Sequence, residues 1–285
     1  MTVQANVSEP CLRVSVVIPA LNEARNLPYV LGRLPPDIHE VIVVDGHSVD
    51  DTIAVARQLC PCVRIVLQTR SGKGNALACG FAAATGDVIA MIDADGSADP
   101  GEIPRFVQAL IAGAEFAKGT RFAPGGGSDD ITRVRALGNR ALVTFVNLCH
   151  GSRYTDLCYG YNVFRRRLVH QLGMDADSPP PQNGRQLWGD GFEVETLIHL
   201  RVAAAGLAVT EVPSFEYARI HGVSNLNAAA DGLRVLRTIL AELYRSRRAR
   251  QRGRAVVAAA PSRPYSGRWH VTGRARPGQR PMPGR

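Results

Sequence analysis

Apolar residues in the first half of the chain gather in short runs. These runs are rich in Val and Ile and do not alternate with polar residues, which is typical of strands buried on both faces. They lie at residues 14–18, 41–44, 63–67, 88–92 and 116–117. Because stretches with helical periodicity separate them, the pattern predicts an α/β fold with a mostly parallel central sheet flanked by helices.

Helical patterns fill the segments between these runs and dominate the second half of the chain. Ser48 is placed to cap the first predicted helix, with Asp51 as its capping-box partner. A glycine-rich loop begins near Gly125. The sequence predicts helices at 51–60, 75–84, 100–112, 133–149 and 191–205, and further strands near 157–164 and 208–212.

The C-terminal part differs from the rest in composition. Residues 226–254 combine a stripe of Leu and Ile with a cluster of arginines, which predicts a helix that is first amphipathic and then basic. Residues 255–285 are rich in Pro, Gly and Arg without any period, and we expect them to be disordered. Before these two segments we place an N-terminal extension at 1–12 and one α/β domain at 13–225.

The net charge of +9 comes from the tail. Residues 245–285 contain 12 Arg and no acidic residue, and removing these 12 from the 34 basic residues leaves 22 against 25 acidic ones. This distribution argues against a basic nucleic-acid-binding face on the domain, so no nucleic-acid partner is expected. A protein that binds nucleic acid through its Arg-rich tail is a less favoured alternative.

The chain shows no pattern for membrane insertion. No apolar run approaches the roughly 18 residues of a membrane span, and the N-terminus does not resemble a signal peptide. We therefore expect a cytoplasmic protein. The amphipathic, Arg-rich C-terminal helix and the tail also fit peripheral contact with the anionic inner face of a membrane.

Charged and polar residues follow each of the first four strands. Parallel strands bind ligands at this edge of the sheet, so their side chains are expected to converge. Asp93 and Asp95, two residues apart in extended chain, point the same way, and their oxygens suit Mg²⁺ or Mn²⁺ held together with phosphate oxygens. A lone aspartate such as Asp99 is equally explained as a helix cap. The converging residues are Glu23, Asp45, Ser48, Arg70, Lys73, Asp93 and Asp95.

Two common nucleotide-binding motifs are absent from the sequence. PALNEA after the first strand contains no glycine, whereas a dinucleotide-binding Rossmann domain needs G-x-G-x-x-G there. Around Lys73 both the spacing and the Ser or Thr of a Walker phosphate loop are missing. The strand-end residues therefore belong to another kind of nucleotide site.

Four ordered motifs resemble glycosyltransferase family 2. They are VVIPALNEARNL, VIVVDGHSVDDT, RSGKGNALACGFAAATGD and VIAMIDADG. The match covers about residues 13–225, and within the family the chain most resembles the dolichol- or polyprenol-phosphate sugar synthases. The segments that carry this closer likeness are KGTRF, RVRALGNR, YTDLCYGYNVFRR and EVPSFEYARIHGVSNL.

The resemblance implies the GT-A fold and transfer, generally with inversion, from a nucleotide-diphosphate sugar such as GDP-mannose or UDP-glucose. It implies a metal at Asp93 and Asp95. Two positions depart from the family pattern: Gly46 replaces the second carboxylate of Asp-Asp-Gly-Ser, and Ser97 replaces a common Gln. The implied nucleotide-binding residues are Pro19, Ala20, Asn22, Glu23, Asp45, Ser48, Lys73, Asp93 and Ala94, and the acceptor-binding ones are Arg121, Arg133, Arg135, Asp156 and Arg219.

The acceptor decides which catalytic groups are needed. A lipid phosphate is already ionised at neutral pH and needs cations that position it, for which Arg121 and Arg133 beside Asp95 are the candidates. A hydroxyl on a glycan or small metabolite needs a general base, and the segment WGDGFEVE offers Asp190 or Glu193, with Glu195 beside them. The favoured interpretation is transfer of a hexose to a polyprenyl phosphate in cell-envelope synthesis, and the hydroxyl acceptor is the alternative.

Overall fold

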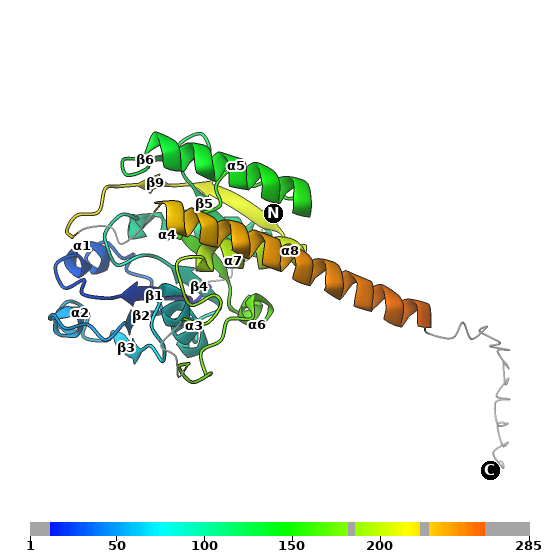
Figure 1. Ribbon diagram of the computed structural model, residues 1–285. Coiled ribbons are helices and arrows are strands. Elements are labelled where there is room, and N and C mark those ends of the chain that lie inside the picture. The colour runs from blue at the N-terminus through cyan, green and yellow to red at the C-terminus, as the bar shows by residue number, and fades with distance from the viewer. Residues whose placement is uncertain (1–11, 182–185, 223–227, 260–285) are drawn as a thin grey trace, which may run out of the picture. The chain divides into compact units, whose positions relative to one another are not determined.

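The structure is a computed structural model that describes residues 12–181, 186–222 and 228–259, with side chains described from 232 to 248 in the last segment. Within these residues a seven-stranded sheet has the order β3-β2-β1-β4-β7-β5-β8 (Figure 1). Neighbouring strands are parallel except that β7 runs antiparallel to β4 and β5. The strands are β1 (Val14–Ala20), β2 (Glu40–Asp45), β3 (Arg64–Leu67), β4 (Val88–Met91), β5 (Phe116–Thr120), β7 (Asn162–Arg165) and β8 (Val209–Pro213). The predicted mostly parallel sheet is confirmed.

Helices cover both faces of this sheet. A separate parallel pair, β6 (Gly127–Ser128) with β9 (Phe215–Glu216), lies outside it. Short 3₁₀ turns at Pro100–Glu102 and Arg166–Leu168 precede two of the helices. The helices are α1 (Leu27–Leu31), α2 (Thr52–Leu59), α3 (Lys73–Ala83), α4 (Ile103–Ile111), α5 (Arg133–His150), α6 (Val169–Leu172), α7 (Val194–Ala204) and α8 (Ala228–Ala259).

The alternation of side chains along the strands sorts the core into two layers. Val16 and Ile18 of β1 pack with α1, α2 and α4 on one face. Val17 points to the other face, where α3, α6 and α7 pack. Because both faces of the central strands are covered, most positions of these strands are apolar, which explains the short apolar runs in the sequence.

A third apolar cluster joins α5, α7 and α8. Val143 and Val146 of α5 meet Leu200 of α7 and Ile239 and Leu243 of α8. The two outer helices are therefore fixed to the sheet through α7. Figure 1 shows α5 and the first turns of α8 on the same side of the domain.

Two local expectations are wrong. Ser48 does not cap α2: Asp50 accepts the Thr52 backbone N–H at 3.0 Å, while Ser48 Oγ accepts the N–H of Asn22. The strand expected near 157–164 begins only at Asn162, and residues 158–161 before it line a cavity.

The chain separates into a compact unit that ends at Ser246 and a second unit from Arg247 onward. The helical backbone continues to Ala259, five residues beyond the helix end expected at Arg254. The expected extension at 1–12, apart from Leu12, and the expected disorder of 260–285 fall outside the described residues. Among the described residues, no helix combines the length and apolarity needed to cross a bilayer.

Candidate functional site

A cavity of about 470 Å³ lies beyond the carboxyl ends of β4 and β5. The charged residues in its lining include Lys73, Asp93, Asp95, Arg121, Arg135 and Arg219, which the sequence placed in one site. An apolar wall is formed largely by the segments around α5 and α8. The apolar residues of that wall include Ile131, Val134, Leu142, Phe192 and Val235.

The first charged cluster of the cavity is centred on Lys73, at the N-terminus of α3. Its Nζ lies 2.6 Å from an oxygen of Asp93 and 2.6 Å from an oxygen of Glu195, which belongs to the first turn of α7. Burial alone would lower the pKa of Lys73, but the two carboxylates raise it above its ordinary value. Burial, together with the negative charge of Asp93, raises the pKa of Glu195 despite the opposing effect of Lys73. Gly160 backs this cluster, since a Cβ there would approach all three groups within 3.5 Å.

The second cluster links the carboxylate pair to the end of β1. Arg219 donates to Glu23 at 2.8 Å and lies 3.1 Å from Asp95. The attraction of Asp95 and Glu23 outweighs burial and raises the pKa of Arg219. Three segments distant in the sequence are thereby brought to one point, as their predicted positions beyond the sheet edge require.

The predicted nucleotide-binding residues at and just after the ends of β1 and β2 do not line the cavity. Asn22 donates its backbone N–H to Ser48 Oγ at 2.9 Å, and Ser48 donates its own N–H to Asp45 at 3.0 Å. The other oxygen of Asp45 is buried and has no hydrogen-bond partner among the described residues. Such an orphaned acceptor is suited to an N–H or O–H of a ligand. Pro19 and Ala20 end β1, and Ala94 is buried between the two aspartates.

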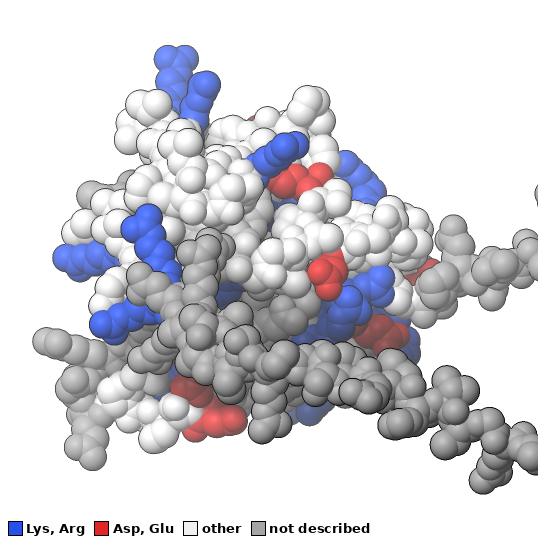
Figure 2. Space-filling view, turned by 90° about the vertical axis from the view of Figure 1, so that its right-hand side faces the viewer, with Lys and Arg blue, Asp and Glu red and all other residues white. Residues whose placement is uncertain are grey.

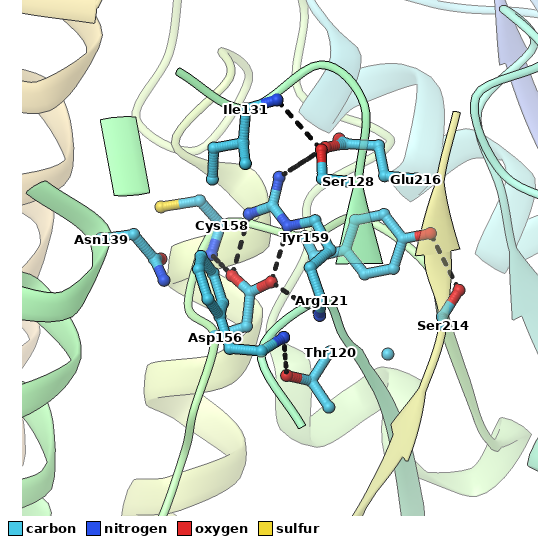
Figure 3. A network of polar contacts seen from close by, with 12 residues as sticks. Thr120, Arg121, Ser128, Ile131, Asn139, Asp156, Cys158, Tyr159, Ser214 and Glu216 are labelled. Atoms are coloured by element: carbon cyan, nitrogen blue, oxygen red, sulfur yellow. Dashed lines mark hydrogen bonds and ion pairs between the residues drawn. The ribbon is translucent and has the colours of Figure 1, made fainter. Parts of the chain in front are cut away.

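Arg121 forms the centre of the third cluster, with a carboxylate on each side (Figure 3). Its Nε and Nη2 donate to Asp156 at 2.7 and 2.9 Å, and its Nη1 donates to Glu216 at 3.0 Å. Glu216 also accepts from Ser128, so β9 and the glycine-rich loop are held to the same guanidinium. Tyr159 places its ring 5.1 Å from the Arg121 guanidinium carbon.

Burial determines how firmly this third cluster is held. Asp156 is 0% exposed and Arg121 is 6% exposed. Burial would raise the pKa of Asp156, but the Arg121 hydrogen bonds and charge hold it below its usual value. Removing one partner of a buried pair typically costs about 3–5 kcal/mol, whereas an exposed pair contributes about 0–1 kcal/mol. Arg121 therefore stays with its carboxylates unless a ligand offers equivalent charge.

The two arginines in the first turn of α5 lie in a different environment. Arg135 lines the cavity, and its exposed pair with Asp130 at 2.9 Å is weak. Arg133 is exposed and does not line the cavity. The structure therefore brings Arg135 to the site and leaves Arg133 at its outer edge.

The acidic residues of WGDGFEVE separate into two groups. Asp190 receives two hydrogen bonds from Arg70, at 2.8 and 2.9 Å, and Glu193 accepts the backbone N–H of Gly189. Neither carboxylate lines the cavity, and both fix the loop that leads into α7. Glu195 is the residue of this segment that enters the cavity wall.

A divalent cation fits the donor set at Asp93 and Asp95. Among the described residues, no group of three or more His, Cys, Asp or Glu side chains could hold a metal by itself. Mg²⁺ commonly uses only one or two carboxylates and takes its other oxygens from phosphates and water. Lys73 and Arg219 contact these two aspartates, so positive charge is already favoured there.

The sequence pattern did not single out two residues that line the cavity. Glu195 was only one of three acidic residues in its segment, and its pairing with Lys73 depends on how α3 and α7 pack. Glu216 follows a predicted strand within EVPSFEYARIHG, where only Arg219 was assigned a role. An unpaired buried arginine is costly, so Arg121 implied at least one carboxylate partner but not which one.

Known proteins resemble this chain over most of its length. The family model described as Glycosyl transferase family 2 matches residues 15–173. A polyprenol monophosphomannose synthase from Mycolicibacterium smegmatis is 32% identical over 232 residues, which cover 77% of this chain and 83% of that protein. An undecaprenyl-phosphate mannosyltransferase from Micrococcus luteus is 31% identical over 251 residues, which cover 84% of this chain and 99% of that protein.

The fold also matches a solved structure. Glucosyl-3-phosphoglycerate synthase from Mycobacterium tuberculosis, crystallised with Mn²⁺, UDP and glucosyl-3-phosphoglycerate, superimposes with a TM-score of 0.63 at 24% identity. The match covers 82% of each chain. At this identity the likeness concerns the arrangement of strands and helices.

Proposed function

We propose a reaction for this chain, which belongs to glycosyl transferase family 2 and is a glycosyltransferase with the GT-A fold. It moves a hexose from a nucleotide-diphosphate sugar to a polyprenyl phosphate. One observation carries the proposal. A single cavity has the carboxylate pair Asp93 and Asp95 on one wall, and Arg135 with apolar side chains on another. Both relatives are named for mannose transfer, so mannose carried by GDP is the proposed donor sugar, with UDP-glucose as the competing donor.

The donor is proposed to lie across the Arg219 link. Glu23, Asp45 and Ser48 would bind the nucleoside. Lys73 and Arg219 would leave Asp93 and Asp95 and bind diphosphate oxygens instead. Mg²⁺ or Mn²⁺ held by Asp93 and Asp95 would supply Lewis-acid stabilisation of the charge that grows on the leaving diphosphate. The orphaned oxygen of Asp45 supports this placement of the nucleoside.

The acceptor phosphate is proposed to meet Arg135 first. With a second pKa near about 6, a phosphate monoester is largely dianionic at neutral pH and attacks the anomeric carbon without a base. Arg135 can leave Asp130 at little cost, because that pair is exposed. Arg121 orders the loop behind it through Glu216 and Ser128.

A hydroxyl acceptor is less well supported. It would require a general base within hydrogen-bond reach of the acceptor, and neither Asp190 nor Glu193 lines the cavity. Glu195 does line it, but Lys73 holds its carboxylate at 2.6 Å.

Contact with a membrane is part of the proposal, because a polyprenyl chain lies in a bilayer. Helix α8 supports it: Leu233, Leu236 and Leu240 are exposed, while Ile239 and Leu243 on its inner face pack against the domain. The arginines that follow would contact anionic headgroups on the inner face of a membrane.

The proposal is tested first by binding and then by transfer. Calorimetry with GDP-mannose and UDP-glucose, each with Mg²⁺, Mn²⁺ or chelator, identifies the donor. That donor is then offered to a water-soluble short-chain polyprenyl phosphate and to the matching free polyprenol. The expected result is transfer to the phosphate alone. Transfer to the free alcohol alone would contradict the proposal that a polyprenyl phosphate is the acceptor.

A matched pair of variants on α5 locates the acceptor phosphate. Arg135→Gln is expected to raise the KM for the short-chain phosphate about tenfold, since a charge-assisted contact contributes about 1.5–3 kcal/mol. Arg140→Gln, on the same helix but outside the cavity, is expected to leave that KM unchanged. An equal effect of both variants would place the phosphate elsewhere.

A further inference from the structure

The outward face of α5 is apolar where a water-facing helix is usually polar. Val134, Leu137 and Leu148 are 78%, 70% and 80% exposed, and Ala141 between them is also exposed. Their spacing of three, four and seven residues places them on one face. The opposite face, with Val143 and Val146, is buried in the third apolar cluster. We call the four exposed residues the α5 stripe.

Cations accompany the α5 stripe without acidic neighbours on the helix. The sequence of α5 contains no Asp or Glu. Arg133 and Arg140 are exposed, and in the described part of the chain no ion-pair partner is found for either guanidinium. At the height of α5, the upper part of Figure 2 is largely uncharged, with Lys or Arg side chains projecting from it.

A second helix presents the same pattern next to the same core. Leu233, Leu236, Leu240 and Tyr244 of α8 are exposed at spacings of three, four and four residues. Both helices bury their other faces in the third apolar cluster. Both also line the cavity, through Val134 of α5 and Val235 of α8. Two exposed apolar stripes therefore border the opening in which the acceptor is expected.

We infer that the α5 stripe inserts into the headgroup region of an anionic lipid bilayer and, together with the first turns of α8, forms the surface on which the enzyme meets its membrane. The inference rests on the proposed function in one respect, because an enzyme that acts on a lipid-linked acceptor must contact the bilayer. An apolar face with flanking arginines is typical of interfacial helices. In a symmetric pairing of two copies through α5, the stripe would bring like-charged arginines together, which disfavours that occupant.

Vesicle binding by the full chain tests the inference without any turnover. The α5 variant is Leu137→Ser with Leu148→Ser, since neither residue lines the cavity. The matched control is Leu59→Ser with Leu67→Ser, two exposed leucines on the β2–β3 side of the domain. The probe is vesicles of phosphatidylcholine and phosphatidylglycerol in an about three-to-one mixture, compared with pure phosphatidylcholine.

The α5 variant is expected to partition onto anionic vesicles at least about tenfold more weakly than the wild type, because each leucine loses its burial. The control variant is expected to bind like the wild type. Arg140→Gln is expected to weaken binding about fivefold on anionic vesicles and not on neutral ones. Equal binding by the α5 variant and the wild type would overturn the inference.

A direct reporter tests insertion of the α5 stripe by a second measurement. The fluorescence emission of the Trp in the Leu137→Trp variant is expected to shift to shorter wavelength when vesicles are added. Unchanged emission from protein that sediments with the vesicles would overturn the inference. A wild-type dimer in ultracentrifugation that dissociates in the α5 variant would assign the stripe to a second copy and also overturn it. If vesicles bind through α5 but no polyprenyl phosphate accepts sugar, the proposed function fails while this inference stands.

Discussion

Single residues in this protein differ most in how their charge is compensated. Lys73, Arg121 and Arg219 each contact two carboxylates, so each cation is held without a bound ligand. The type of each residue was visible in the sequence, and the partners were not. A cation that is buried must find a counter-charge, but the sequence does not say which of many acidic residues will be near.

The substitution Arg121→Met tests the buried pair that Arg121 forms with Asp156. Asp156 then stays buried without its main cation, and we expect the free energy of unfolding to fall by about 3–5 kcal/mol at pH 7. In the wild type the pKa of Asp156 is lowered from its ordinary value of 3.8, so this carboxylate stabilises the fold at pH values above 3.8. The contribution is lost as the pH falls further. In the variant burial raises that pKa, so stability instead falls as pH rises.

Urea unfolding of Arg121→Met at pH 5 and pH 8 measures this reversal. The stability deficit is expected to be smaller at pH 5 than at pH 8. The double variant with Asp156→Asn should show a deficit that does not depend on pH. A deficit of equal size at both pH values in the single variant would contradict the argument.

His199 provides a second pH-dependent contribution, away from the cavity. Burial lowers its pKa to about 3 from an ordinary value of 6.5, and its Nδ1 contacts the carbonyl of Leu157 at 2.9 Å. The folded protein therefore keeps the ring neutral while the unfolded chain takes up a proton below pH 6.5. Stability is lost on acidification, by about 2 kcal/mol between pH 6.5 and 5.

The comparison of wild type with His199→Gln measures that contribution. The variant loses the ring contacts with Leu157 and with the side chain of Asn162 and is less stable at pH 7.5, but its stability should fall less on acidification. The measurement is urea unfolding at pH 7.5 and 5. Parallel losses in the two proteins would show that His199 does not carry the effect.

Elements bring the site together through close backbone packing. The N-terminus of α3 lies against the loop before α7, where Gly74 donates its N–H to the carbonyl of Asp190 at 2.8 Å. That contact sets Lys73 beside Glu195. The sequence placed Lys73 in the site, and the glycines on either side of it are explained by this backbone approach.

Two glycine substitutions separate close packing from open space. A Cβ at Gly74 would lie 1.7 Å from the carbonyl oxygen of Gly189, whereas nothing lies within 4 Å of one at Gly138 in α5. Gly74→Ala is expected to lower the free energy of unfolding by about 2 kcal/mol or more and to weaken donor binding. Gly138→Ala is expected to raise it by about 0.5–1 kcal/mol, because alanine favours the helix.

Thermal unfolding and donor calorimetry check both changes. The two substitutions add the same methyl group, so opposite signs are expected only if the backbone contact is the cause. A neutral Gly74→Ala variant would show that α3 and the loop can separate without cost.

At the scale of the whole molecule, charge and fold are carried by different parts of the chain. The compact unit ends at Ser246, and residues 247–285 contain 11 of the 34 basic residues. Without them the chain has 23 basic and 25 acidic residues, so its net charge changes from +9 to −2. The third apolar cluster reaches only to Leu243, so its packing does not depend on the removed part.

Truncation after Ser246 is expected to leave the unfolding midpoint within about 2 °C of the wild type, since a change of 1 kcal/mol shifts it by only about 2–4 °C. Binding to anionic vesicles should weaken about tenfold or more and lose most of its salt dependence, because each Arg near the surface contributes about 1 kcal/mol. Sedimentation with vesicles at low and high salt is the measurement. Unchanged binding would remove the tail from the proposed membrane contact.

The sequence by itself determined the mostly parallel sheet, most of its covering helices except α1 and α6, the carboxylate pair and the family, because Val- and Ile-rich runs and ordered motifs are local signals. Only the tertiary structure decided that Glu195 and Glu216 enter the cavity wall while Asp190 and Glu193 do not. It also divided α8 into a packed face with Ile239 and an exposed face with Leu240. The physical reason is that spacing along a strand or helix fixes which side chains share a face, whereas the partner opposite that face is set by how distant elements pack.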